Sequence, residues 1–262
     1  MKRFILYACL GLFVSRLVLF GGECVQAGAV DVVECPIDWD GDTPRLVDFS
    51  EYLKAPAGKD GFIRVQEGHL ATGGGERFRI WGVNVTSTYC FPSKEEADRM
   101  AEDLARLGVN CVRFHGLDSN WGRSAIDQSR EDSQHLDAEN MARFDYLVWK
   151  LKEKGIYTNL NLNVFRTYDA NDGVRDHKEL YFGKSATYYN PRRLELQRDY
   201  ARKLLTHRNA HTGNTYCEEP AVLCVELVNE NSLLEGWVNN RLNPEGNTNR
   251  GTWAPLPQSY VD

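Results

Sequence analysis

Residues 221–232 read AVLCVELVNENS and decide the fold. The part from 221 to 228 is an apolar run, rich in β-branched residues and of the length of a strand. Such a run predicts a strand that is buried on both faces, as in a parallel sheet. The run is followed directly by Asn229-Glu230-Asn231. These polar residues thus stand at the C-terminal end of the predicted strand, which is where a parallel α/β barrel places its functional side chains. We therefore expect Glu230 to face a functional site.

Three further stretches upstream have the composition of strands. They cover residues 78–84, 109–115 and 156–164. A polar residue stands at or near the C-terminal end of every one of the four predicted strands, as expected for a barrel mouth lined for a polar ligand. These residues are Asn84, His115, Asn163 and Glu230.

Helical patterns alternate with these strands. The first helix begins with the capping box at residues 93–96 and ends at Gly108. The second carries apolar residues at helical spacing between 141 and 151 and ends at Gly155, and the third begins at Asn190-Pro191. Strands that alternate with helices predict parallel βαβ units with right-handed crossovers.

An open, doubly wound sheet would show the same alternation. No glycine-rich phosphate-binding turn follows the first strand, which counts against a nucleotide-binding sheet. We therefore predict an α/β fold, a (β/α)8 TIM barrel that is truncated here after about the fourth strand. A small β-hairpin at residues 62–70 precedes it, within a lead-in at 28–76, and the barrel strands start from residue 77.

The N-terminus has the pattern of an export signal. Lys2 and Arg3 precede a short apolar run at residues 5–13, and small residues follow near the end of segment 1–27. The alternative is a membrane anchor, but Arg16 leaves the apolar run short of the roughly 20 residues that a span needs. We expect a cleaved signal peptide at 1–27, no membrane attachment afterwards, and a secreted or periplasmic protein.

Composition and charge narrow the function further. The chain of 262 residues carries a formal net charge of −6 and no run of Lys or Arg, which argues against a nucleic-acid partner. Its seven cysteines include no CxxC spacing, and no His, Asp or Glu cluster has the spacing of metal ligands. We propose no metal and no cofactor.

Four stretches, taken together and in order, resemble the retaining β-glycosidases of glycoside hydrolase family 5, the cellulase and mannanase family of the (β/α)8 clan. They are RIWGVN at 79–84, LGVNCVRFH at 107–115, GIYTNLNLN at 155–163 and ELVNE at 226–230. The resemblance covers about residues 60–262. It implies a hydrolase that cleaves the O-glycosidic bonds of a β-linked polysaccharide or oligosaccharide, a β-glucan or β-mannan, with retention.

The resemblance also assigns roles to residues. It makes Glu230 the catalytic acid/base, Asn229 the residue that binds the sugar 2-hydroxyl, and Arg113 the residue that steadies the nucleophile. It places substrate contacts at the ends of the second and third strands. There His115 is a candidate, and Asn163 stands where the family often has a histidine.

Aromatic side chains and a second carboxylate complete the candidates. Sugar rings bind on aromatic platforms, and Trp121 and Trp253 lie in the predicted loops after the second and fourth strands. Glu226 shares its strand face with Glu230. Because an isolated buried carboxylate is costly, we expect Glu226 to form a structural ion pair with an arginine such as Arg113.

The family's nucleophile is a glutamate at the end of the seventh strand. This chain ends at Asp262, shortly after the fourth predicted strand, whereas a full barrel takes roughly 250 residues. We therefore expect residues 28–262 to be the N-terminal part of a glycosidase barrel, inactive as a fragment. The alternatives are a non-catalytic carbohydrate-binding barrel and a metal-dependent barrel lyase or isomerase.

Overall fold

The computed structural model describes residues 48–180 and 184–232, together with Leu234 and Val238. All of them belong to the larger of two compact units, Thr43–Asp262. The predicted signal peptide, the first part of the lead-in and Trp253 lie outside the described residues. Within the described ranges, no helix combines the length and the apolar character that crossing a membrane requires.

A four-stranded sheet forms the centre of the fold. Its strands are β3 (Gly82–Thr86), β4 (Cys111–His115), β5 (Tyr157–Asn161) and β6 (Val222–Glu226). They lie side by side in the order of the sequence, and every pair is parallel. The parallel sheet predicted from the sequence is confirmed.

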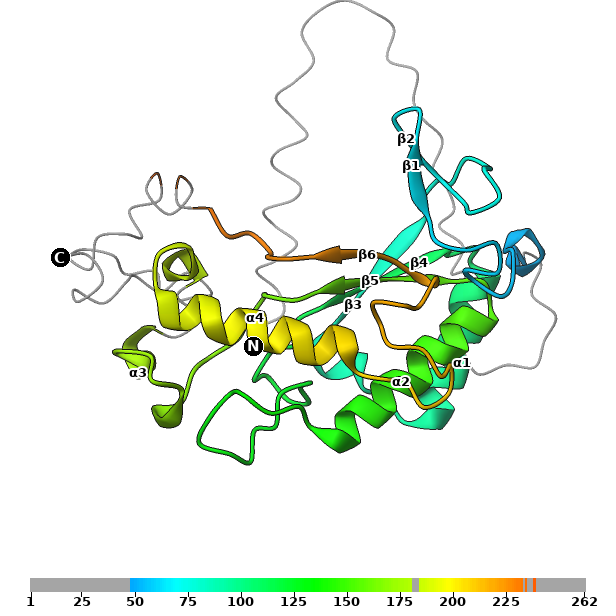
Figure 1. Cartoon of the computed structure of the whole chain (residues 1–262). Helices are drawn as coiled ribbons and strands as arrows, with labels where there is room; N and C mark the ends of the chain where they lie inside the picture. The colour runs from blue at the N-terminus through cyan, green and yellow to red at the C-terminus, as the bar shows by residue number, and fades with distance from the viewer. Residues whose placement is uncertain (1–47, 181–183, 233, 235–237, 239–262) are drawn as a thin grey trace, which may run out of the picture. The chain divides into compact units, whose positions relative to one another are not determined.

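Three long helices connect these strands: α1 (Lys94–Arg106), α2 (Ala138–Glu153) and α4 (Pro191–Thr206). Figure 1 shows all three on the same side of the sheet. A doubly wound sheet would carry helices on both faces and reverse its strand order. In a (β/α)8 barrel, by contrast, the strands follow one another in sequence order and the helices all cover the same face. The described residues contain four strands arranged in this way.

Local signals explain where the helices begin. The Ser93 side chain accepts the Glu96 N–H, and the Glu96 carboxylate accepts the Ser93 N–H, so α1 has the predicted capping box. Asp137 caps α2, and Asn190 caps α4 just before Pro191. These ends are set by neighbours in the sequence, which is why they could be predicted.

The core lies between the sheet and the helices. Phe114 of β4 and Phe144 of α2 are both fully buried, with ring centroids 4.8 Å apart in an edge-to-face arrangement. Leu160 of β5 and Leu151 of α2 belong to the same buried cluster. Because side chains alternate along a strand, residues of the opposite parity point away from the helices.

The described part of the lead-in, from residue 48, contains a short 3₁₀ helix, η1 (Ser50–Tyr52), and the predicted hairpin, formed by β1 (Arg64–Gln66) and β2 (His69–Ala71). The Ala57 N–H donates to the Lys152 carbonyl, close to the start of β5, so the lead-in lies at the N-terminal ends of the strands.

The predicted first strand, 78–84, was wrong at its start. The Phe78 N–H donates to the Leu70 carbonyl, so Phe78 extends the hairpin, and β3 begins only at Gly82. The apolar run at 78–81 therefore does not belong to the central sheet.

The segments that follow the strands contain more structure than the sequence suggested. A 3₁₀ helix, η2 (Ser87–Cys90), follows β3. The segment 166–189 contains η3 (Ala170–Asp172), α3 (His177–Leu180) and η4 (Lys184–Tyr188). These helices are too short to give a periodic apolar pattern.

Buried arginines hold the 166–189 segment in place. The Arg166 guanidinium donates to the carbonyls of Ser133 and Leu196, at 2.7 and 2.9 Å. Tyr168 packs against both Arg166 and Arg193, whose guanidinium carbons lie 5.3 and 4.8 Å from its ring centroid. Around these contacts, four apolar residues of the segment form a buried cluster with Leu196 of α4, apart from the main core: Tyr168, Val174, Leu180 and Ala186.

Candidate active site

The register of the sheet brings five polar side chains to its helix-free face. Arg113 pairs with Asn159 across β4 and β5, and Asn161 pairs with Glu226 across β5 and β6. His115 has the same parity as Arg113, one step nearer the C-terminal end of β4. Three of the four strands, β4, β5 and β6, thus converge on one polar cluster, at the end where a barrel holds its chemistry.

Glu226 is at the centre of this cluster. Arg113 binds it in a bidentate pair, with Nε to Oε1 and Nη2 to Oε2 both at 2.6 Å. The side-chain amides of Asn159 and Asn161 donate to the same two oxygens, at 2.6 and 3.1 Å. The hydrogen bonds from Arg113 are the main reason why the pKa of Glu226 lies below the ordinary glutamate value. The ion pair expected from the sequence is confirmed.

Arg113 also orients two other predicted site residues. Its Nη2 donates to Asn229 Oδ1 at 2.9 Å, and its Nη1 lies 3.1 Å from His115 Nδ1. Arginine can only donate, so Nδ1 of His115 is the acceptor and its hydrogen is on Nε2. With Oδ1 of Asn229 occupied, the amide nitrogen of that residue is the group that can meet a substrate hydroxyl.

His115 is held in its neutral form. Burial, followed by the charges of Arg113 and Lys184, lowers its pKa below the ordinary histidine value. The negative charges of Glu230 and Glu226 act to raise this pKa, but each is a smaller cause than those that lower it. A neutral ring with its hydrogen on Nε2 can donate one hydrogen bond to a ligand.

Glu230 differs from its neighbours in the cluster. It is exposed, and its backbone is in the left-handed region with φ of 45°. Its negative charge acts to raise the pKa of both Arg113 and His115, so Glu230 lies within electrostatic range of them. From the part of the chain that the structure describes, its carboxylate accepts no hydrogen bond. Glu230 is therefore the carboxylate of this cluster that is open to a ligand.

Asn163 is located differently from what the sequence suggested. Its side chain is 1% exposed, so it does not line an open surface. Its carbonyl accepts the Asn229 N–H at 2.9 Å, which ties the end of β5 to the segment after β6. Its role as a substrate contact stays a prediction.

An aromatic row extends from the cluster. Trp121 is 46% exposed, and its ring packs on Phe165 with centroids 4.4 Å apart. Phe165 in turn meets the His115 ring edge-to-face at 5.3 Å. Gly116 has a positive φ of 79°, and a Cβ there would lie 3.0 Å from the Phe165 ring, so both the backbone and this close packing favour glycine. Trp121 is thus connected to the cluster through Phe165, which the sequence did not reveal.

Two further residues near the cluster come from the 166–189 segment. Lys184 is 4% exposed, and its Nζ donates to the Asn229 carbonyl at 2.8 Å. The Tyr188 hydroxyl donates to the Asn231 carbonyl. No sequence signal predicts either contact, because an isolated lysine and tyrosine in a polar stretch have no periodicity.

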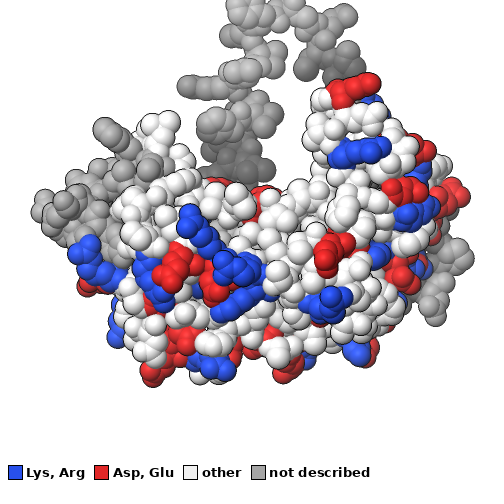
Figure 2. Space-filling view, viewed as in Figure 1, with Lys and Arg blue, Asp and Glu red and all other residues white. Residues whose placement is uncertain are grey.

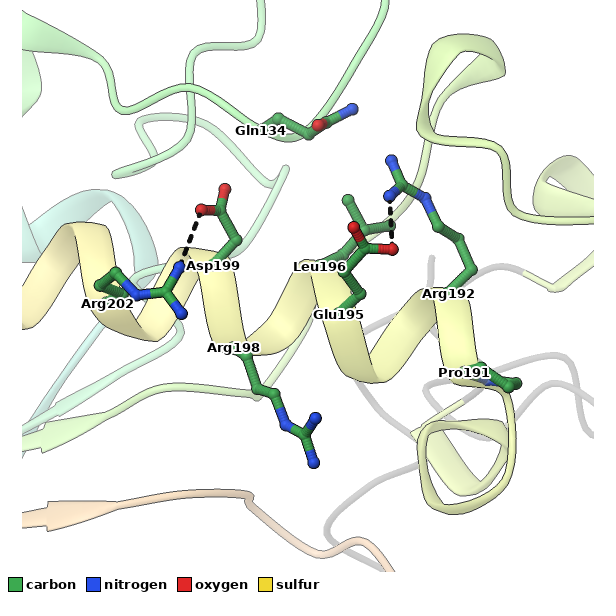
Figure 3. A pocket seen from close by; sticks show the side chains of 8 residues that line it. All are labelled: Gln134, Pro191, Arg192, Glu195, Leu196, Arg198, Asp199 and Arg202. Atoms are coloured by element: carbon green, nitrogen blue, oxygen red, sulfur yellow. Dashed lines mark hydrogen bonds and ion pairs between the residues drawn. The ribbon is translucent and has the colours of Figure 1, made fainter.

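Other features of the described surface do not form part of this site. A pocket of about 250 Å³ lies along the outer face of α4 and shares no residue with the cluster (Figure 3). Two ion pairs join charged residues that line this pocket, Arg192 with Glu195 and Arg202 with Asp199.

Basic and acidic side chains are interspersed on the face that Figure 2 shows. Among the described residues, no group of three His, Cys, Asp or Glu side chains could hold a metal ion.

Fold and site together define part of a (β/α)8 barrel with a polar cluster at the strand ends. The fold is that of glycoside hydrolase family 5 barrels, as two solved structures show. The endo-1,4-beta-mannanase from Rhizomucor miehei is 20% identical, with a TM-score of 0.51 over 65% of this chain and 48% of that one. The family 5 mannosidase from the same organism is 16% identical, with a TM-score of 0.50 over 65% and 49%.

The described chain spans about half the length of these two structures. No family model matches the sequence, and no curated protein matches it either. Because the two structures are 20% and 16% identical to this chain, their similarity to it shows a shared fold and nothing further.

Proposed function

We propose that this protein is the acid/base half of a retaining β-glycosidase that acts on a β-linked polysaccharide, with Glu230 as the acid/base. One observation carries the proposal: of the two glutamates at the end of β6, Glu226 is fully engaged by Arg113 and two amides, whereas Glu230 is open. The two structures named above are a mannanase and a mannosidase, so β-mannan is the first substrate to test and β-glucan the second.

Retaining hydrolysis uses two carboxyl groups about 5–5.5 Å apart. In the first step, Glu230 protonates the leaving oxygen while a nucleophilic carboxylate attacks the anomeric carbon. In the second step, Glu230 removes a proton from the water that displaces the enzyme carboxylate. His115 Nε2 and the Asn229 amide would bind sugar hydroxyls beside it, and Trp121 would pack on a sugar face.

The nucleophile is assigned to a carboxylate outside the described residues. Glu226 shares the sheet face, but a nucleophile needs an oxygen free to bond to carbon, and both Glu226 oxygens accept two hydrogen bonds each.

We also propose that the protein is exported, because residues 1–27 have the pattern of a signal peptide.

The test uses the full-length barrel protein that contains these residues, called here the complete barrel. Glu230→Gln should lower turnover of β-mannan or β-glucan by about 10²–10⁴-fold, the usual contribution of general acid–base catalysis. Glu67→Gln is the matched control, because Glu67 is another exposed glutamate with a positive φ, 50°, but lies in the hairpin turn. Turnover of Glu230→Gln within about threefold of wild type would refute the assignment.

Product stereochemistry provides a second test. The first anomer released from a β-linked substrate should have the β configuration, as seen by NMR before mutarotation. An α product would contradict retention. Binding of oligosaccharides by the complete barrel without turnover would favour the non-catalytic alternative.

A further inference from the structure

The backbone of Glu230 requires an explanation. A non-glycine residue in the left-handed region is strained and persists only where its surroundings impose that conformation. Among the described residues, Glu67, Ser87, Asp176 and Glu230 have this conformation. For Glu67 the cause is local, because it forms a two-residue hairpin turn with Gly68, whose φ is also positive. Glu230 lies in no such turn, so its conformation must come from elsewhere.

The cause is found in η4. The carbonyl before Glu230 belongs to Asn229 and accepts a hydrogen bond from Lys184 Nζ at 2.8 Å. The carbonyl after Glu230 belongs to Asn231 and accepts a hydrogen bond from the Tyr188 hydroxyl. Both donors come from the single segment that precedes α4, so one element holds the chain on each side of Glu230.

A third contact restrains the chain before Glu230. The Asn229 N–H donates to the Asn163 carbonyl at 2.9 Å, and the Asn229 side chain accepts from Arg113. Asn229 is thus fixed at its N–H, its carbonyl and its amide oxygen. The backbone conformation of Glu230, which lies between Asn229 and Asn231, is therefore set by contacts from residues elsewhere in the chain.

The burial of Lys184 fits a role of this kind. A lysine that is 4% exposed loses most of its hydration, which is costly unless its protons are used. Its Nζ meets the Asn229 carbonyl and lies 5.7 Å from the centroid of the Phe165 ring, where the ring face attracts a cation. Lys184 thus connects the aromatic row to the chain that carries Glu230.

We propose that Lys184 and Tyr188 are positioning residues that hold Glu230 in its left-handed conformation and so aim its carboxyl group at the leaving oxygen. This rests on the proposed role of Glu230 as acid/base. When either donor is removed, the chain can relax toward an ordinary negative φ, which turns the Glu230 side chain away. A displacement of about 1 Å at a catalytic group can cost about 10²-fold in rate.

The variants Tyr188→Phe and Lys184→Met, made in the complete barrel, test the proposal. Tyr189→Phe and Lys178→Met, in the same segment, are the matched controls. We expect kcat on β-mannan to fall about tenfold in Tyr188→Phe and more in Lys184→Met, with KM within about twofold of wild type. The controls should stay within about twofold of wild type in both constants.

Azide separates positioning from a loss of folded protein. With an activated aryl glycoside, the aryl group leaves without protonation, and the second step then depends on Glu230 as base. Azide needs no base: its nitrogen attacks the anomeric carbon, the bond to the enzyme carboxylate breaks, and a glycosyl azide forms. Azide should therefore restore turnover in Tyr188→Phe and Lys184→Met, as in Glu230→Gln, whereas unfolded enzyme gains nothing.

The outcomes are distinct. Lower kcat with azide rescue in Tyr188→Phe supports positioning, and this variant decides the outcome because it removes a single oxygen atom. The same result in Lys184→Met extends that support to the lysine. Wild-type kcat in Tyr188→Phe, or a loss that azide does not rescue, overturns it. If Glu230→Gln itself retains activity, the proposed function fails instead. If Glu230→Gln is impaired and rescued while Tyr188→Phe is unchanged, only the positioning proposal fails.

Discussion

Glu226 and Glu230 lie four positions apart at the end of β6, and they have opposite surroundings. Glu226 accepts four hydrogen bonds from Arg113, Asn159 and Asn161, which favour its ionised form. Glu230 is exposed, has a strained backbone conformation, and lies within electrostatic range of the same arginine. Two identical side chains are thus given two roles by their environments, one structural and one available for proton transfer.

The largest effect is expected for the 262-residue chain on its own: no glycosidase turnover, and self-association. Within the described residues, both oxygens of Glu226 are occupied, so this glutamate cannot serve as the nucleophile that Glu230 needs. Within the described residues, β3 and β6 each have a partner strand on one side alone, and Trp81 and Leu227 are 67% and 71% exposed. Assays on β-mannan, β-glucan and aryl glycosides, with gel filtration, would check this. A monomer with turnover that is lost in Glu226→Gln would make Glu226 the nucleophile.

Stability should distinguish the two glutamates in the complete barrel. Glu226→Gln leaves Arg113 without its carboxylate. The new glutamine N–H₂ group also faces N–H donors that the carboxylate accepted, so hydrogen bonds are lost. We therefore expect a decrease of about 2–3 kcal/mol in the free energy of unfolding. Glu230→Gln should change this free energy by less than about 0.5 kcal/mol. Urea denaturation measures both. Equal losses would remove the distinction between the two side chains.

The stability contribution of Glu226 should depend on pH. Its folded pKa is below the ordinary value of 4.5, so its contribution is present above that value and is lost as pH falls through the folded pKa. The stability difference between wild type and Glu226→Gln should therefore be constant above about pH 5 and shrink in more acidic solution. Urea denaturation over a pH series gives this difference. A difference independent of pH would show that Glu226 is not an ionised partner of Arg113.

A smaller effect is expected at Asn229. Asn229→Ala should lower both kcat and kcat/KM by about tenfold, because contacts with the 2-hydroxyl strengthen in the transition state. Steady-state kinetics on β-mannan measures both constants. An increase in KM with unchanged kcat would show that Asn229 binds the ground state and the transition state equally.

Much of this arrangement could be predicted from the sequence. The capping box at Ser93 and the Asn190-Pro191 pair are local signals, and the structure confirms both. The pairing of Glu226 with Arg113 followed from strand parity and from the cost of an unpaired buried charge. Such features depend on a few neighbouring residues or on a single periodicity.

The remainder depends on contacts that are distant in the sequence. Cys224 is exposed because it points to the helix-free face of β6, which the apolar composition of that strand does not indicate. Phe78 was assigned to the sheet, but its N–H is used by the hairpin. Lys184 and Tyr188 reach the chain around Glu230 from more than 40 residues away, and no local pattern indicates such a contact.

The central claim is that Glu230, and not Glu226, donates the proton to the leaving oxygen. The most direct test is kcat/KM of the complete barrel on a series of aryl glycosides whose leaving phenols differ in pKa. Without the acid, the rate depends more steeply on the leaving group, so Glu230→Gln should give a steeper slope than wild type, and Glu226→Gln a parallel one. A Glu230→Gln slope parallel to that of wild type, or a steep slope in Glu226→Gln, would contradict the account.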